Sequence, residues 1–381
     1  MTRTSRRVGP SLVLISALTA AGVLLSACSN LEPEPPSSVG ESPSDANTDA
    51  TSSDASNEAP SEEPPEVSSA RIAVSSKGIE IDRDFPDPTV IRAGDSYYAY
   101  ATQTETDTGF TNIQLARSKD LQEWFYLGEA LPEKPTWAQD NQAYWAPHVV
   151  ARGGTYYLYY SAVPDDTSEG ENCLAVATSE SPEGPFEDAG EPVFCSYEID
   201  PMVYRDPASK RWFMYWGSAG DIAIQRMSND LLSLKGQQTT LLLGWNAPKK
   251  DRLPYEHGIE GPFVIRRSGW YYLFYSGDRC CEYPPHYAVL VARSRRPNRG
   301  FKRIGEVEER KDSTILTDWG RWKGPGHCSV VPGRTGTDWI ACHAIDEGHR
   351  YIDGPSSGVR RVMLVRRLSI RNGWPYIQRN S

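Results

Sequence analysis

One sequence unit occurs five times along this chain of 381 residues. Each copy contains a short run of β-branched residues, a turn, and a second run rich in aromatic residues. Four copies have a proline near their start and the fifth has a cysteine there; these positions are separated by 59, 54, 61 and 66 residues and are Pro88, Pro147, Pro201, Pro262 and Cys328. Recurrence at such a period indicates a repeat architecture, in which each copy forms one structural unit.

Each copy has the pattern of a β-hairpin, because β-branched and aromatic residues on both sides of a turn favour two paired strands. A further strand-like run follows in four copies, at residues 112–117, 174–178, 222–227 and 287–293. Two hairpins make a four-stranded blade, so we predict an all-β fold, a five-bladed β-propeller over residues 71–381. The alternative is a β-sandwich, but sandwiches show no such repeat. We expect the strands at 361–368 and 374–377 to close the ring together with the segment 72–81.

The first 27 residues have the composition of an export signal. Three arginines precede an apolar run at residues 12–25, and small residues lead to Cys28. This order is typical of a secretory signal peptide and is too short for a membrane-spanning helix. Because it ends at a cysteine, it resembles a bacterial lipoprotein signal, which implies cleavage after residue 27, a lipid anchor on Cys28 and a place at the cell surface. The alternative is an ordinary signal peptide in which Cys28 is incidental.

Residues 28–70 separate this signal from the repeats. They consist mostly of Ser, Pro, Glu, Asp, Ala and Thr, which cannot bury enough apolar surface to order the chain, so we predict a disordered tether. Residues 31–70 contain ten acidic and no basic side chains, whereas residues 71–381 contain 40 acidic and 37 basic ones. The net charge of −10 therefore comes mainly from the tether, and the nearly neutral domain offers no basic face for nucleic acid.

Six cysteines lie within the repeats, and an even number in an exported chain favours disulfides. Cys173 with Cys195, and Cys328 with Cys342, are each placed to join neighbouring strands. Adjacent Cys280 and Cys281 are then either a vicinal pair or partners of other cysteines, and the sequence does not settle the connectivity. A zinc site is the competing interpretation, but no Cys-x-x-Cys or spaced His pair supports it.

The strands that open the blades of a propeller line its central channel, so the residues at the start of the copies are expected to meet in one funnel. These residues are Asp87, Trp145, Asp200, Glu260 and His327. Carboxylates held close together resist simultaneous ionisation, and such a cluster indicates a functional site. Two of them suffice to hydrolyse a glycosidic bond, one as acid and one as base, while a third tunes the acid. A single Asp-Pro more commonly opens a turn, so the prediction depends on the group.

Combined, the motifs resemble glycoside hydrolase family 43 over about residues 80–378. They are Phe85-Pro86-Asp87-Pro88, Trp145-Ala146-Pro147, Ile199-Asp200-Pro201, Glu260-Gly261-Pro262-Phe263 and Gly326-His327-Cys328-Ser329. Two features depart from the family pattern. Cys328 stands where a small polar residue is expected, and Cys280-Cys281 interrupts the loop after the fourth aromatic strand, so the local shape of the substrate pocket is open to question.

The resemblance implies a role for each opening residue. Asp87 resembles the general base, Glu260 the general acid, and Asp200 the residue that raises the pKa of the acid and orients it. Trp145 resembles a wall of the sugar subsite, with a core tryptophan as the alternative, and Phe85 is expected to contact the substrate. His327 is expected in the channel beneath the site, near a bound calcium, or as an ordinary core histidine.

The implied function is inverting hydrolysis of arabinose- or xylose-containing polysaccharide from plants or cell walls. The main expectation is an α-L-arabinofuranosidase or arabinanase that works as a monomer and needs no cofactor for the chemistry, with a structural calcium as the one candidate metal. A β-xylosidase of the same fold is the close alternative. A propeller that only binds glycan is the alternative from another class, although such a protein has no need to keep an acid and a base facing each other.

Overall fold

A computed structural model describes residues 72–379, apart from residues 77, 107–108, 141, 167–170, 252 and 353–357. The expected signal peptide at residues 1–27 and the expected lipidated Cys28 with its tether at residues 28–70 lie outside the described residues. In the described part of the chain, no helix is both long and apolar enough to span a bilayer.

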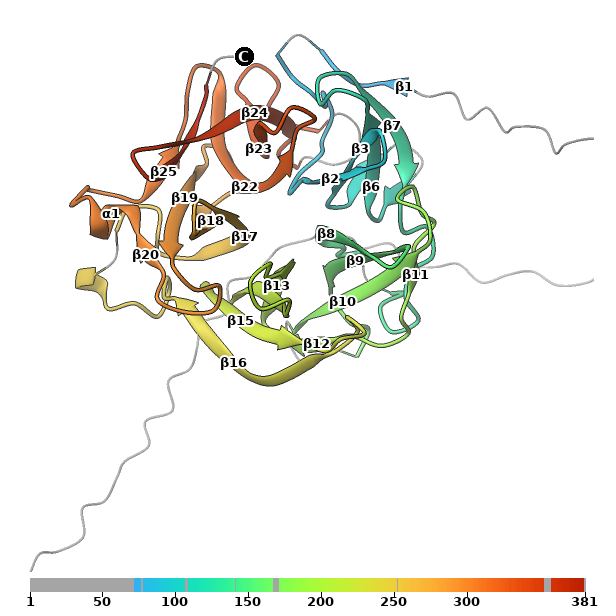
Figure 1. Ribbon diagram of the computed structural model, residues 1–381. Coiled ribbons are helices and arrows are strands. Elements are labelled where there is room, and N and C mark those ends of the chain that lie inside the picture. Colours follow the sequence, from blue (N-terminus) through green and yellow to red (C-terminus); the bar gives the residue numbers. More distant parts are fainter. Residues whose placement is uncertain are drawn as a thin grey trace, which may run out of the picture. The chain divides into compact units, whose positions relative to one another are not determined.

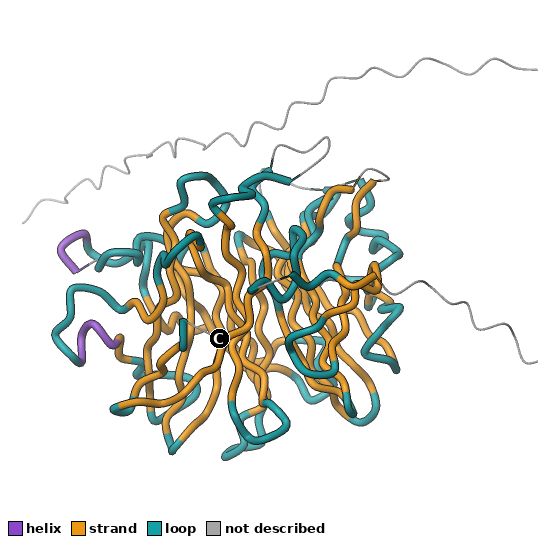
Figure 2. The backbone as a smooth tube through the Cα atoms, turned by 90° about the horizontal axis from the view of Figure 1, so that it is seen from above, coloured by secondary structure: helices purple, strands orange, loops and turns teal. Residues whose placement is uncertain are grey.

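The described residues form the predicted five-bladed β-propeller, with the blades following one another around a ring (Figure 1). Turned by 90°, the strands run between two faces that carry the loops (Figure 2). From the centre outward, the first blade contains β2 (Thr89–Ala93), β3 (Ser96–Ala101), β6 (Gln114–Ser118), β7 (Trp124–Glu129) and β1 (Ile72–Ala73). The second contains β8 (Trp145–Arg152), β9 (Thr155–Ala162), β10 (Asn172–Ser179) and β11 (Glu187–Asp188), with β12 (Phe194–Ser196) also paired to β10.

The remaining blades follow the same plan. The third contains β13 (Glu198–Arg205), β14 (Trp212–Ser218), β15 (Asp221–Met227) and β16 (Leu234–Leu242). The fourth contains β17 (Ile259–Arg267), β18 (Trp270–Arg279), β19 (His286–Ser294) and β20 (Lys302–Arg303), with β21 (Thr314–Leu316) also on β19. The fifth contains β22 (Trp322–Pro332), β23 (Asp338–Asp346), β24 (Arg361–Arg371) and β25 (Trp374–Ile377). A small hairpin of β4 (Thr104–Thr106) and β5 (Gly109–Thr111), the 3-10 turn Lys249–Asp251 and α1 (Ile304–Val307) complete the described elements.

The five innermost strands contact one another in a closed ring of β2, β8, β13, β17 and β22. Closure follows the predicted route in part. The last two strands complete the fifth blade by themselves, and Ile81 of the expected closing segment bridges to Met363 in β24. The start of that segment, β1, instead pairs with the outer strand β7 of the first blade.

The aromatic second strand of each blade supplies the core. Successive side chains of a strand point to opposite faces, so in β9 the rings of Tyr159 and Tyr160 pack toward different neighbouring blades. The same alternation in β18 sends Leu273 toward the third blade and Tyr272 toward the fifth. Because each sheet is sandwiched between two others, these strands are apolar on both faces, which is why the aromatic runs are so pronounced in the sequence.

Two disulfides join strands as expected from the sequence. Cys173 pairs with Cys195 between β10 and β12, and Cys328 pairs with Cys342 between β22 and β23. The third links Cys280 to its neighbour Cys281, which decides between the two alternatives left open for these residues.

Candidate active site

Each innermost strand has a left-handed residue within it or just before it. Asp87, Ala146, Asp200, Gly261 and His327 have φ values of 55°, 49°, 62°, 59° and 46°. In four of the strands the ladder register also shifts at this point, as at a β-bulge. Bulges redirect side chains and are common beside active sites. Strain of this kind in non-glycine residues is also concentrated at functional sites.

This backbone pattern corrects one detail of the repeat alignment. The opening residues occupy two adjacent positions, because Trp145 and Glu260 come one residue before the left-handed position that Asp87, Asp200 and His327 occupy. The side chains still meet. All five residues line the same central cavity, so the convergence expected from the sequence does not require equivalent positions.

The funnel holds a cavity of about 480 Å³. Asp87, Trp145, Asp200, Glu260 and His327 all line it. Trp145 is half-buried and forms part of the wall, as expected for a residue that contacts a ligand. This volume lies within the range of small-molecule sites.

Phe85 is not among the residues that line the cavity, and its expected contact with substrate was wrong. Its side chain is fully buried in the cluster with Ile81, Val90 and Trp124, where the first and fifth blades meet. A large apolar ring gains most by full burial, so this position of the motif contributes to the core and not to the funnel.

Asp87 is surrounded by groups that favour its charged form. Its Oδ1 accepts a hydrogen bond from Arg361 at 3.1 Å and lies 3.0 Å from Nδ1 of His343 and 3.4 Å from Nδ1 of His327. Its Oδ2 accepts a hydrogen bond from the Thr102 hydroxyl at 2.6 Å. Burial alone would raise the pKa of Asp87, but the Arg361 guanidinium, His327 and the hydrogen bond with His343 outweigh it and hold that pKa well below its usual value.

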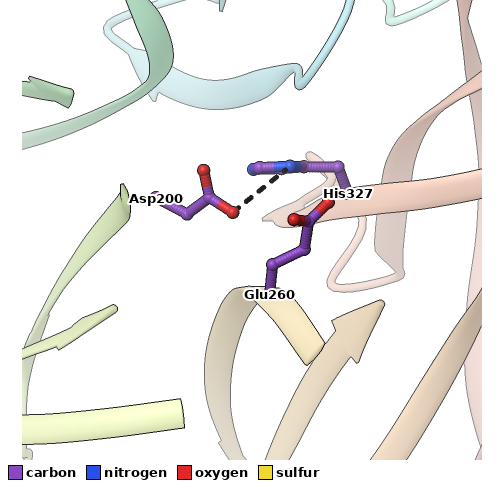
Figure 3. A group of neighbouring side chains, drawn as sticks. All are labelled: Asp200, Glu260 and His327. Carbon is purple, nitrogen blue, oxygen red and sulfur yellow. Dashed lines mark ion pairs between the residues drawn. The ribbon is translucent and has the colours of Figure 1, made fainter. Parts of the chain in front are cut away.

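Glu260 and Asp200 have the opposite tendency. Burial and the nearby Asp200 raise the pKa of Glu260 to about 7, against the lowering effects of His327 and of a 2.7 Å hydrogen bond donated by the Tyr287 hydroxyl. Burial and the charge of Asp87 raise the pKa of Asp200 to about 7 as well. The two carboxyl groups and His327 face one another (Figure 3), with Asp200 3.9 Å from Nδ1 of His327. Near neutral pH the site therefore holds one firmly ionised carboxylate and a coupled pair that retains a proton.

Gly261 lets these groups approach one another. Its backbone N–H donates to Asp200 Oδ2 at 2.9 Å, and a Cβ added to it would lie 3.2 Å from the His327 ring. A side chain here would push the imidazole away from the carboxylates, and only glycine takes the left-handed conformation without strain.

Several site residues were not found from the sequence. Thr102, Tyr287, His343 and Arg361 lie on or beside the second and third strands of their blades, not at the repeat openings. Tyr287 and Arg361 fall within runs recognised only as strands, so their roles had no separate signal. One signal in the sequence could have found them. Residues at the funnel end of the second and third strands must lie near the residues that open the first strands.

One cluster in the described residues has the composition of a metal site. Ligand atoms of Asp200, Glu260 and His327 lie within 4.8 Å of one another. Calcium takes six to eight oxygen ligands, whereas this group offers two carboxyl groups and one imidazole. The donor set does not fit directly coordinated calcium, so no step below passes through a metal.

The family model for glycosyl hydrolases family 43 matches residues 81–375, which includes all five blades. The chain belongs to this family. It is thus a glycosidase that hydrolyses O-glycosyl bonds.

Curated family 43 relatives have several specificities. The chain is 24% identical to an extracellular exo-alpha-(1->5)-L-arabinofuranosidase of Cellvibrio japonicus, over 81% of this chain and 89% of that protein. It is 24% identical to an extracellular endo-alpha-(1->5)-L-arabinanase of Bacillus subtilis, over 76% and 86%. It is 29% identical to a xylan 1,3-beta-xylosidase of a Vibrio species, over 77% of this chain and 55% of that one. The crystal structure of a thermostable family-43 glycoside hydrolase has a TM-score of 0.64 to this chain at 26% identity, covering 81% of this chain and 96% of that one.

Proposed function

We propose that this family 43 enzyme hydrolyses its substrate with inversion, with Asp87 as general base and Glu260 as general acid. The observation that carries the proposal is the opposite tendency of the two carboxyl groups. Arg361 keeps Asp87 ionised and able to take a proton from water, whereas burial and Asp200 keep Glu260 protonated and able to donate to the departing oxygen. An acid and a base with separated pKa values are what single-step displacement by water requires.

Asp200 serves as the residue that raises the pKa of Glu260 and orients it. It accepts the Gly261 N–H, which directly follows Glu260, so it holds the backbone next to the acid as well as acting on it by charge. Trp145 provides an apolar wall for the sugar. Its indole stands beside carboxylates that must face the scissile bond, which suits stacking against the C–H face of a pentose.

The substrate class we propose is α-L-arabinofuranosyl linkages in arabinan or arabinoxylan. Two curated relatives matched over more than three quarters of this chain act on α-(1->5)-linked L-arabinose by name. A β-xylosidase is the second candidate, because a xylosidase relative has somewhat higher identity. A propeller that only holds glycan would gain nothing from an ionised Asp87 beside a protonated Glu260.

We also propose that the enzyme is exported and held at the membrane through a lipid on Cys28. Both arabinan-cleaving relatives are extracellular by name, and three disulfides suit an oxidising compartment. We propose that it acts as a monomer, since the funnel of one chain brings together the base, the acid and the Trp145 wall. Mass spectrometry of the membrane fraction would test the anchor, since a Cys28→Ser variant should lose the lipid and leave the membrane.

Two measurements test the proposed reaction. Nitrophenyl α-L-arabinofuranoside, nitrophenyl β-D-xyloside and linear arabinan are compared as substrates, and we expect the arabinosides to be cleaved fastest. Proton NMR of the first product should show the inverted anomer. A retained anomer would exclude the base role of Asp87, and inactivity on all three compounds would overturn the proposed specificity.

The pH profile should depend on the pKa of Glu260. Because the acid must be protonated, kcat/KM is expected to fall as pH rises through about 7. The acid limb is set by Asp87, whose pKa is held well below its usual value, so that limb lies below the usual carboxylate range. Tyr287→Phe removes a hydrogen bond that favours ionised Glu260, so it should move the alkaline limb upward by about one pH unit. Asp200→Asn removes a negative charge that raises this pKa, so it should move the limb downward. Shifts in the same direction would contradict Glu260 as the titrating acid.

A further inference from the structure

The disulfide between Cys280 and Cys281 lies in the wall of the catalytic cavity. It belongs to the loop that leaves β18, and β18 pairs with β17 at the acid, where Glu260 lies opposite Ser276. Cys280 follows Ser276 by four residues, so the two sulfurs stand on the Glu260 side of the funnel. Cys280 is half-buried and Cys281 is exposed, which leaves sulfur surface available to a bound molecule.

This disulfide is expected to add little to the stability of the fold. A cross-link stabilises a protein mainly by shortening the loop that the unfolded chain can explore, and the effect grows with the number of residues enclosed. The other two disulfides have sequence separations of 22 and 14, whereas Cys280 and Cys281 are neighbours. The stabilising effect expected of the first two is therefore almost absent from the third.

The loop is also fixed by other contacts. The Asp278 carboxylate lies 2.8 Å from Nδ1 of His286 at the two ends of the loop, and Arg279 forms an ion pair with Glu282 at 2.7 Å. The Tyr283 hydroxyl donates to Glu347 in the fifth blade at 3.2 Å. The ends and the tip of the loop are thus restrained by contacts other than the disulfide.

What the disulfide does add is surface chemistry. Two bonded sulfurs are polarisable, do not titrate, and donate no hydrogen bond, unlike the thiols or hydroxyls that could occupy the same positions. The rest of the cavity combines carboxylates and Arg361 with the apolar side chains of Trp145 and Ile199. A sugar presents both hydroxyl groups and C–H groups, and sulfur suits the latter.

We propose that the Cys280–Cys281 disulfide is a substrate-contacting wall that packs against C–H groups of the pentose unit next to the scissile bond. This inference rests on the proposed function, since it takes a pentose-containing saccharide as the ligand. Its contribution is to binding, so removal should raise KM more than it lowers kcat.

The test uses two double variants, C280A/C281A and C280S/C281S, with C173A/C195A as the matched control that removes a disulfide elsewhere. With the best substrate of the unmodified enzyme, we expect KM to rise about 10-fold in both test variants, as for the loss of a small apolar contact. We expect kcat to change less than threefold and the melting temperature to stay near that of the unmodified enzyme. The Ser variant, which exposes polar groups to the C–H face, should have the larger KM. The control should retain the original KM at temperatures where it is folded.

The outcomes separate the two proposals. An unmodified enzyme that cleaves no arabinoside or xyloside overturns the proposed function. An active enzyme whose KM is unchanged in both double variants overturns the role of the disulfide alone, as does a large loss of melting temperature with unchanged KM.

If neither variant folds, the unmodified enzyme is treated with dithiothreitol. The two thiols of this reagent form a cyclic disulfide as the exposed protein disulfide is reduced. Alkylation and mass spectrometry of a sample identify the stage at which only Cys280 and Cys281 are free, and an unchanged KM at that stage also refutes the proposal.

Discussion

Glu260→Gln is expected to lower kcat/KM on an arabino- or xylo-oligosaccharide by about 10²–10⁴-fold, the usual contribution of a general acid. The protein should remain folded, because Gln has the shape of the protonated acid that burial already favours at this position, and its oxygen can still accept the Tyr287 hydroxyl. Sugar binding should therefore persist. Calorimetric titration with the oligosaccharide, alongside initial rates, measures both effects on one preparation.

The leaving group provides the decisive comparison for this variant. The dinitrophenolate of a dinitrophenyl glycoside leaves as a stable anion without protonation, so Glu260→Gln should lose far less activity on this substrate than on the oligosaccharide. Tyr287→Phe is the matched control, because it changes the environment of Glu260 but leaves the acid in place. Equal losses on both substrates would mean that Glu260 positions the sugar and does not donate the proton.

The fold could be predicted from the sequence because every blade has to meet the same requirement for burial. Each blade is buried between two others, so the aromatic second strand must be apolar on both faces, and this produces a pattern that recurs five times. The pairs Cys173–Cys195 and Cys328–Cys342 were candidates from the sequence, but only the structure decided the connectivity. By contrast, the pairing of β1 with β7 could not be foreseen, since two residues at a sheet edge leave no periodic pattern.

The sequence predicted only those site residues that lie at the repeated strand openings. Asp87, Asp200 and Glu260 occur at strand openings, so their convergence follows from the ring. Arg361 lowers the pKa of Asp87, and the Tyr287 hydrogen bond partly offsets the effect of burial on Glu260. Both residues come from strands whose sequence pattern indicates burial and gives no sign of a functional role. Phe85 shows the opposite error, because membership of a motif does not distinguish a residue that faces the funnel from one that packs beneath it.

Asp87→Asn should reduce kcat by about 10²–10⁴-fold, since an amide cannot accept a proton from water. Asn tolerates the left-handed backbone at this position, where φ is 55°, so the substitution changes charge more than conformation. Loss of the Asp87 charge should also lower the pKa values of Asp200 and Glu260, which that charge raises. The residual activity should therefore decline at a lower pH than in the unmodified enzyme. Thr102→Val, which removes a hydrogen bond to Asp87 but keeps the carboxylate, is the control and should cost less than tenfold.

Chemical rescue distinguishes a base from a residue that merely shapes the cavity. Asp87→Gly opens space where the carboxylate stood, and glycine adopts the local backbone without strain. Azide needs no base, so it should attack the anomeric carbon from the vacated side while Glu260 protonates the departing oxygen, which forms a glycosyl azide of inverted configuration. Rescue of turnover by azide in Asp87→Gly, and its absence in Glu260→Gln acting on an oligosaccharide, would assign the two roles separately. A glycosyl azide of retained configuration would place the attack on the other face of the sugar, and Asp87 would then be the wrong residue.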